Sequence, residues 1–137
     1  MKNQGAGIED LTDIFVKQVR SILEYGAPVW NSSLIKQEVF EIERVQKVFL
    51  HMVLGREYES YEIALQKTDL ENLADRRETL CRNFAIKTQK NPKYSHWFVQ
   101  NQKRVNTRSV LKFKAPYFKH DRYRKSPIVY LTNLLNS

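Results

Sequence analysis

The sequence SILEYGAPVW, Ser21 to Trp30, decides how this chain folds, because it combines large apolar side chains with two helix breakers. Gly26 allows a left-handed backbone at little steric cost, and Pro28 disfavours the α conformation for the residue before it. A helix that enters this stretch therefore has to end near Gly26. We expect the aromatic residues Tyr25 and Trp30 to pack the resulting corner.

Apolar residues at three- and four-residue spacing predict a helix on each side of this corner. The first covers residues 8–23, and the second follows the polar residues 31–33 and ends before Gly55. Together they are expected to form a helical hairpin. The predicted inner stripe of the second helix consists of Ile35, Val39, Ile42, Val45, Phe49, Met52 and Val53.

Two further helices are predicted before residue 92. Ser60 can cap a short helix that reaches about Gln66, and Asn72 with Asp75 resembles a capping box at the start of a fourth helix. The Asn91-Pro92 pair should end this helix. Its predicted buried side consists of Leu73, Leu80, Cys81, Phe84 and Ala85. We therefore predict a mainly α fold, with a bundle-like or orthogonal four-helix domain over residues 1–92.

The sequence changes character after Pro92. Residues 87–125 contain 12 Lys and Arg against one Asp, whereas residues 1–86 contain 11 against 14 acidic residues. Aromatic residues are interleaved with these cations, and the helical periodicity is lost. We expect a basic, irregular arm over about 100–125, followed by a short last helix that starts at Ser126-Pro127. Residues 93–137 thus form a predicted extension that packs on the helical domain or trails it.

Such a concentration of positive charge predicts a polyanionic partner, RNA or DNA. The alternative is a basic tail whose charge serves only to keep it soluble. Aromatic rings among the cations can stack on unpaired bases, although Tyr94, Trp97 and Phe98 are expected rather to cover the bundle. Lys17, Arg20, Arg44 and Lys47 are weaker candidates in the helical domain. The candidate nucleic-acid-binding residues are Lys103, Arg104, Arg108, Lys112, Lys114, Lys119, Arg122, Arg124 and Lys125.

Other kinds of site find little support in the sequence. It has no adjacent Asp pair for metal-dependent nucleotidyl transfer and no glycine-rich phosphate loop. One cysteine and three scattered histidines do not make an ordinary zinc site, and Cys81 reads as a buried helix residue. We therefore predict no catalytic residue, metal or cofactor. Without a long apolar run, we expect an intracellular, soluble protein, cytoplasmic or nuclear, that is not bound to a membrane.

Several stretches of the sequence, taken in order, resemble the C-terminal part of reverse transcriptases of non-LTR retrotransposons of the jockey-like or RTE-like kind. The matching stretches are VRSILEYGAPVWNSSL (19–34), IERVQK (42–47), SYEIAL (60–65), LADRRETLCRNFAIKTQKNP (73–92) and RYRKSPIVYLTNLLN (122–136). No single stretch is diagnostic, and the resemblance depends on their order. It covers nearly the whole chain from about Gly5.

The resemblance implies a helical thumb followed by a basic C-terminal extension, which together grip a template and primer while a separate palm carries out polymerisation. The palm's aromatic-x-Asp-Asp turn has no counterpart here, so we expect no polymerase activity from this chain alone. A reverse transcriptase palm and a second copy of the chain are candidate protein partners. Two other hypotheses stay open: a helical protein-interaction or oligomerisation module, and a retroelement remnant without a selected function.

Overall fold

The computed structural model describes residues 5–101 and 111–137. Within these ranges the chain is mainly α-helical, as predicted, and its one β-type pairing is an isolated antiparallel bridge between Gln100 and Phe113. The chain divides into two compact units: unit 1 comprises residues 1–25 and 35–76, and unit 2 comprises residues 26–34 and 77–137. No helix in the described part of the chain has the length and apolar character needed to cross a membrane.

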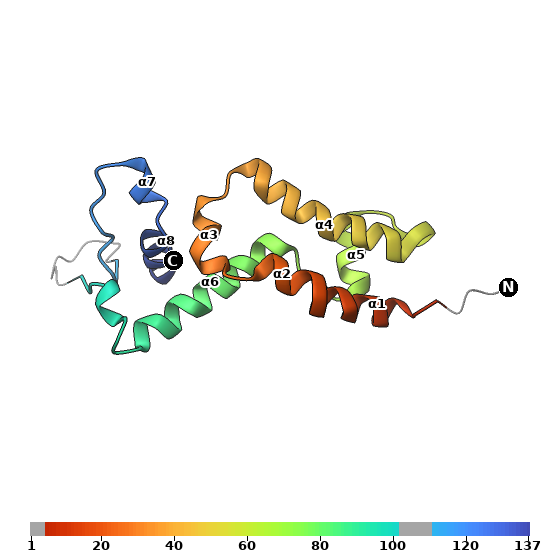
Figure 1. Ribbon diagram of the computed structural model, residues 1–137, viewed down its shortest axis with the longest axis horizontal. Helices are drawn as coiled ribbons and strands as arrows, with labels where there is room; N and C mark the ends of the chain where they lie inside the picture. The colour runs from red at the N-terminus through yellow and green to blue at the C-terminus, as the bar shows by residue number, and fades with distance from the viewer. Residues whose placement is uncertain (1–4, 102–110) are drawn as a thin grey trace. The chain divides into compact units, whose positions relative to one another are not determined.

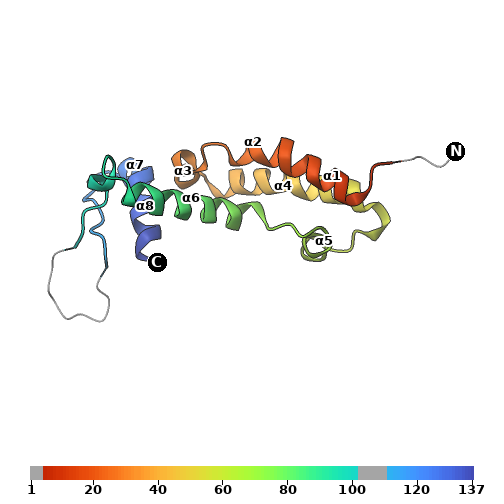
Figure 2. The ribbon, with the colours of Figure 1, turned by 90° about the horizontal axis from the view of Figure 1, so that it is seen from below.

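Unit 1 is organised by the predicted helical hairpin, whose two arms run side by side (Figures 1 and 2). A short 3-10 turn follows the second arm, and two further helical pieces complete the unit. The first arm is continuous and consists of α1 (Ile8–Ile14), a π-helical segment (Phe15–Arg20) and α2 (Ser21–Glu24), and the second arm is α4 (Lys36–Leu54). The remaining elements are α5 (Tyr61–Thr68) and the first turn of α6 (Leu73–Lys90).

The predicted caps of α5 and α6 are confirmed. The Ser60 hydroxyl accepts the backbone N–H of Ile63 at 3.3 Å, and the Asn72 side-chain oxygen accepts that of Asp75 at 2.8 Å. Each bond satisfies one of the N–H groups that a helix leaves unpaired at its first turn. The start of both helices is therefore fixed by residues that the sequence alone identifies.

The core of unit 1 lies between the two arms of the hairpin and α5. Phe15 stacks on Phe49 with ring centroids 4.1 Å apart and an interplanar angle of 12°. The buried apolar residues of this core are Phe15, Leu50, Leu54, Ala64 and Leu70. The hairpin thus owes its stability to contacts between residues more than thirty positions apart in the sequence.

The buried face of α4 differs from the predicted one. Val45 is exposed and Met52 is 70% exposed, whereas Gln46 is fully buried together with Leu50 and Leu54. The Gln46 side-chain amide donates to the Tyr61 hydroxyl at 3.1 Å and to the Glu71 carbonyl at 2.8 Å. These two acceptors satisfy the nitrogen of the side-chain amide and offset part of the cost of burying Gln46, while Val45 faces outward.

Unit 2 combines residues 26–34, at and after the corner, with residues 77–137. α8 packs against α3, and Ser32 and Asn31 in the turn after α3 bond to the chain at and before α8 (Figure 1). The elements of unit 2 are α3 (Ala27–Trp30), a 3-10 turn (Asn31–Ser33), α6 from Arg77 onward, a 3-10 turn (Ser95–Trp97), α7 (Asp121–Arg124) and α8 (Pro127–Asn136).

The core of unit 2 unites residues on both sides of Pro92, where the sequence predicted a domain boundary. Its buried residues are Ala27, Cys81, Ala85, Phe98, Phe113, Leu131 and Leu134. Burial raises the pKa of the Cys81 thiol, as expected for a packed helix cysteine. The division between the compact units falls instead at Gly26, Leu34 and Arg76, so that α6 starts in unit 1 and continues into unit 2.

The corner at 21–30 is confirmed as a helix end, with two corrections. Gly26 has a left-handed backbone, with φ of 66°, as its position required. Ala27, however, is helical and fully buried as the first residue of α3, because its place in the core of unit 2 outweighs the effect of Pro28. Tyr25 is 86% exposed and does not pack the corner, whereas Trp30 is half-buried against the core of unit 2.

The buried side of α6 also contains a residue that the sequence analysis left out. Arg77 lies on the stripe with Cys81 and Ala85 and is only 1% exposed. Its guanidinium donates to the Asn31 side-chain oxygen at 3.2 Å and lies over the Trp30 ring. Phe84, which was predicted to be buried, is instead exposed.

Candidate nucleic-acid interface

Six of the nine predicted nucleic-acid-binding residues belong to the described part of unit 2. All six are exposed: Lys112, Lys114, Lys119, Arg122, Arg124 and Lys125. The other three, Lys103, Arg104 and Arg108, lie outside the described residues. The predicted cationic surface is therefore present on the arm to the extent that the structure describes it.

Phe113 fixes the segment that carries Lys112 and Lys114. Its side chain is buried and meets Phe98 edge to face, with ring centroids 6.3 Å apart. Its backbone N–H donates to the Asn136 side-chain oxygen and its carbonyl accepts from the Asn136 amide, both at 2.9 Å. Phe113 is one of the aromatic residues interleaved with the cations in the sequence, and the structure places its ring in the core of unit 2.

The second group of cations lies on and just after α7. His120 precedes this helix, and the Arg124 guanidinium forms an exposed ion pair with Asp121 at 3.3 Å. Such surface pairs contribute little to stability and leave the cation accessible. The backbone carbonyl of Lys125 accepts a hydrogen bond from the Ser32 hydroxyl at 2.7 Å. The chain is thus anchored at Lys125 while its side chain stays exposed.

The cations predicted as weaker candidates in unit 1 have partners within that unit. Lys17 pairs with Asp13 at 2.9 Å and Arg44 with Glu41 at 3.6 Å, and Lys47 lies over the rings of Phe40 and Tyr61. Arg20 pairs with Glu24 at 3.6 Å. These partners reduce the charge that unit 1 presents to a polyanion.

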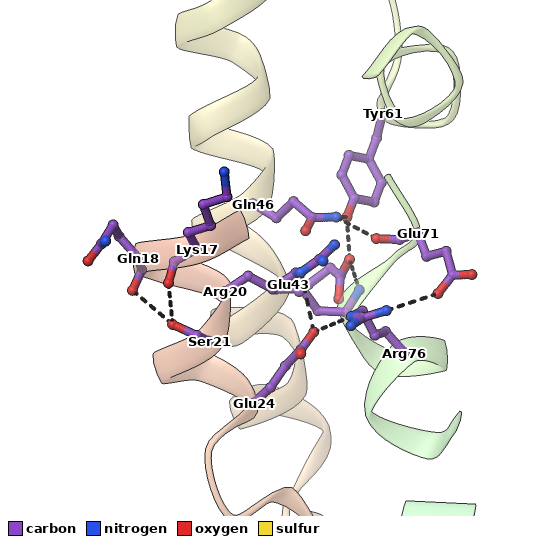
Figure 3. A network of polar contacts seen from close by, with 11 residues as sticks. Lys17, Gln18, Arg20, Ser21, Glu24, Glu43, Gln46, Tyr61, Glu71 and Arg76 are labelled. Atoms are coloured by element: carbon purple, nitrogen blue, oxygen red, sulfur yellow. Dashed lines mark hydrogen bonds and ion pairs between the residues drawn. The ribbon is translucent and has the colours of Figure 1, made fainter. Parts of the chain in front are cut away.

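Figure 3 shows a network of ion pairs and hydrogen bonds within unit 1. Glu24 accepts from Arg76 at 2.6 Å as well as pairing with Arg20, and burial followed by repulsion from Arg76 lowers the pKa of Arg20. On the neighbouring side, one oxygen of Glu43 accepts from the Tyr61 hydroxyl and from the Leu73 N–H. This network ties the helices of unit 1 together.

The two units differ in charge as clearly as in contacts. Unit 1 carries 9 Lys and Arg against 13 acidic residues, and unit 2 carries 14 against 2. The acids of unit 2, Glu78 and Asp121, each pair with an arginine of the same unit, Arg82 and Arg124. Unit 2 therefore carries a large excess of positive charge, and both of its acidic side chains are already paired.

Exposed aromatic rings accompany these cations. Tyr117, Phe118 and Tyr123 are all exposed on the arm. Of the three rings predicted to cover the bundle, Phe98 is buried and Tyr94 and Trp97 are half-buried. Lys87, Lys90 and Lys93, which the list of candidates omitted, are also exposed, and the dense run of positive charge after residue 86 was the signal for them.

The described residues do not bring together the side chains of a metal centre. Within residues 5–101 and 111–137, no three His, Cys, Asp or Glu side chains come close enough together to hold a metal ion. No protein-family model, no curated protein and no solved structure matches this chain.

Proposed function

We propose that this protein is a non-catalytic nucleic-acid-binding module in which unit 2 holds the phosphate backbone of RNA, DNA or their hybrid. The observation that carries the proposal is the exposure of all six described arm cations in a unit of 14 basic and 2 acidic residues. Lys and Arg neutralise phosphates and release the counterions that surround them, which favours binding. The resemblance to a reverse transcriptase thumb and extension agrees with this role.

The arrangement of the cations supports contact with a backbone rather than with one compact anion. Lys112 and Lys114 flank a buried anchor, Phe113, and the remaining cations follow over residues 119–125. A chain of phosphates presents charge at regular intervals and can meet such a spread of cations. Phosphate contacts of this kind position a nucleic acid without reading its sequence.

A titration with a fluorescent RNA–DNA hybrid tests the proposal. The Lys112→Gln/Lys114→Gln variant should bind several-fold more weakly than the wild type, because two phosphate contacts are lost. The matched control, Lys36→Gln/Arg56→Gln, removes the same charge from exposed residues of unit 1 and should bind nearly as tightly as the wild type. Equal losses in the two variants would show that only net charge matters and would contradict an interface on the arm.

A second candidate function, protein interaction or self-association, is favoured by an apolar hollow in unit 1. The hollow has a volume of about 490 Å³, and Val45, Val48 and Met52 of α4 are exposed in it. Exposed apolar surface of this kind is often a protein contact. Sedimentation of the wild type and of Val48→Asp tests this function. A complex that the substitution dissociates would support it, and monomers in both cases would exclude self-association.

A further inference from the structure

Unit 2 contains a hollow at the C-terminal end of α6. The residues that line it belong neither to the buried core of unit 2 nor to the candidate cations of the arm. Its volume is about 440 Å³, which is within the range of small-molecule sites. Three of the residues that line it are aromatic and one is a lysine. The lining residues are Phe84, Lys87, Thr88, Asn91, Tyr94 and Trp97.

A tight turn after α6 positions two of the rings. The carbonyl of Asn91 accepts the N–H groups of Tyr94 at 3.0 Å and Ser95 at 2.9 Å, while its side chain accepts that of Lys93 at 3.0 Å. The Tyr94 carbonyl then accepts the Trp97 N–H at 3.0 Å. The chain therefore turns back on itself and holds the Tyr94 and Trp97 rings with centroids 5.1 Å apart and planes inclined by 48°.

Phe84 adds a third ring from the last turns of α6. It is 41% exposed, although its neighbour Ala85 is fully buried in the core of unit 2. Aromatic faces gain free energy by stacking on another planar ring, and partial exposure keeps such a face accessible. The combination of Phe84 with Tyr94 and Trp97 around one hollow thus suits a planar aromatic ligand.

The charge around the hollow indicates that this ligand is part of an anion. Lys87 lines the hollow, Lys90 and Lys93 are exposed nearby in the sequence, and the Lys93 ammonium lies 5.5 Å from the centre of the Tyr94 ring. The two acidic residues of unit 2 are both paired with arginines. A base joined to phosphates satisfies both the rings and the lysines.

The hollow is also linked directly to the arm. Phe98 follows Trp97 and meets Phe113, and the Lys114 N–H donates to the Val99 carbonyl at 2.8 Å. Lys112 and Lys114 therefore lie on a segment that is paired with the chain leaving the hollow. The same contacts therefore hold the ring-lined hollow and the two lysines proposed to contact phosphates.

We propose that this hollow binds an unpaired nucleobase, so that the nucleic acid held by unit 2 is single-stranded where it meets α6. The inference rests on the proposed function and adds to it the kind of nucleic acid. A paired base inside a duplex presents only its edges, whereas an unpaired base offers the face that Phe84, Tyr94 and Trp97 can stack on. Lys87 neutralises a neighbouring phosphate.

Two oligonucleotides of equal length, oligothymidine and its abasic counterpart, separate base binding from backbone binding. The wild type should bind oligothymidine about tenfold more tightly than the abasic strand, the value expected for stacking of a base on aromatic side chains. Phe84→Ala and Tyr94→Ala should each lose about 5- to 10-fold for oligothymidine and nothing for the abasic strand. Tyr25→Ala, an exposed aromatic residue of unit 1, is the matched control and should change neither affinity.

The outcomes distinguish this inference from the proposed function. Equal affinity of the wild type for the two strands, with no effect of Phe84→Ala, would overturn the base site and leave backbone binding in place. No binding to either strand, with binding to the RNA–DNA hybrid kept, would overturn the base site alone, and loss of hybrid binding as well would overturn both. Circular dichroism and thermal unfolding check that each variant folds, and Tyr94→Phe, which keeps the ring, should restore most of the affinity that Tyr94→Ala loses.

Discussion

Tyr61 shows most clearly how single residues hold unit 1 together. Its hydroxyl donates to Glu43 and accepts from the buried amide of Gln46, so that it joins α5 to α4. Burial, and then the hydrogen bond to Glu43, raises the pKa of Tyr61 above its ordinary value. The folded protein therefore holds this proton more tightly than the unfolded chain does.

The stability that this shift contributes is complete below the ordinary tyrosine pKa of about 10 and is lost as the pH rises above it. We expect Tyr61→Phe to lower the free energy of unfolding near neutral pH by about 1–3 kcal/mol, because Glu43 loses a donor. The variant should then lose less further stability than the wild type in alkaline solution. Urea denaturation from neutral to alkaline pH measures both free energies of unfolding. Equal losses of stability by the variant and the wild type in alkaline solution would contradict the role of Tyr61.

Residue types revealed the corner and the caps, but not the partners of buried polar groups. Gly26 and Asn72 act through their own backbone and neighbours, so the sequence was sufficient to predict them. Arg77 and Gln46 are buried because of Asn31, Tyr61 and the Glu71 carbonyl, which are distant in the sequence. No local pattern contains those contacts.

At the scale of elements, periodicity predicted where α4 runs but not which face it buries. Apolar residues lie almost all round this helix, so several stripes fit the three- and four-residue spacing equally well. The hydrogen bonds of Gln46 decide between them. In the first arm, the π-helical segment Phe15–Arg20 likewise changes the register that a regular helix would have given.

The register of α4 has a measurable consequence. Leu50→Ala should lower the free energy of unfolding by about 2–5 kcal/mol, because it opens a cavity in the core of unit 1. Met52→Ala should change it by no more than about 0.5 kcal/mol, because Met52 is exposed. Denaturant titration measures the free energy of unfolding of both variants. A large loss of stability in Met52→Ala would contradict the observed register and favour the buried face predicted from the sequence.

At the scale of the whole molecule, the charge contrast was readable from the sequence, whereas the grouping of the chain was not. Lysines and arginines concentrate after residue 86 and acidic residues before it. Residues 26–34, however, join the C-terminal residues because Ala27 is buried in the core with Phe98, Phe113 and Leu131. A contact between such distant segments leaves no mark in local composition.

The salt dependence of binding to an RNA–DNA hybrid tests the central claim, that unit 2 binds a phosphate backbone through its exposed cations. The logarithm of the wild-type association constant should fall linearly and steeply with the logarithm of salt concentration. For Lys112→Gln/Lys114→Gln the slope should be shallower by about 1.8, since each lost phosphate contact removes about 0.9. Binding that is absent, or that does not weaken as salt rises, would contradict the account.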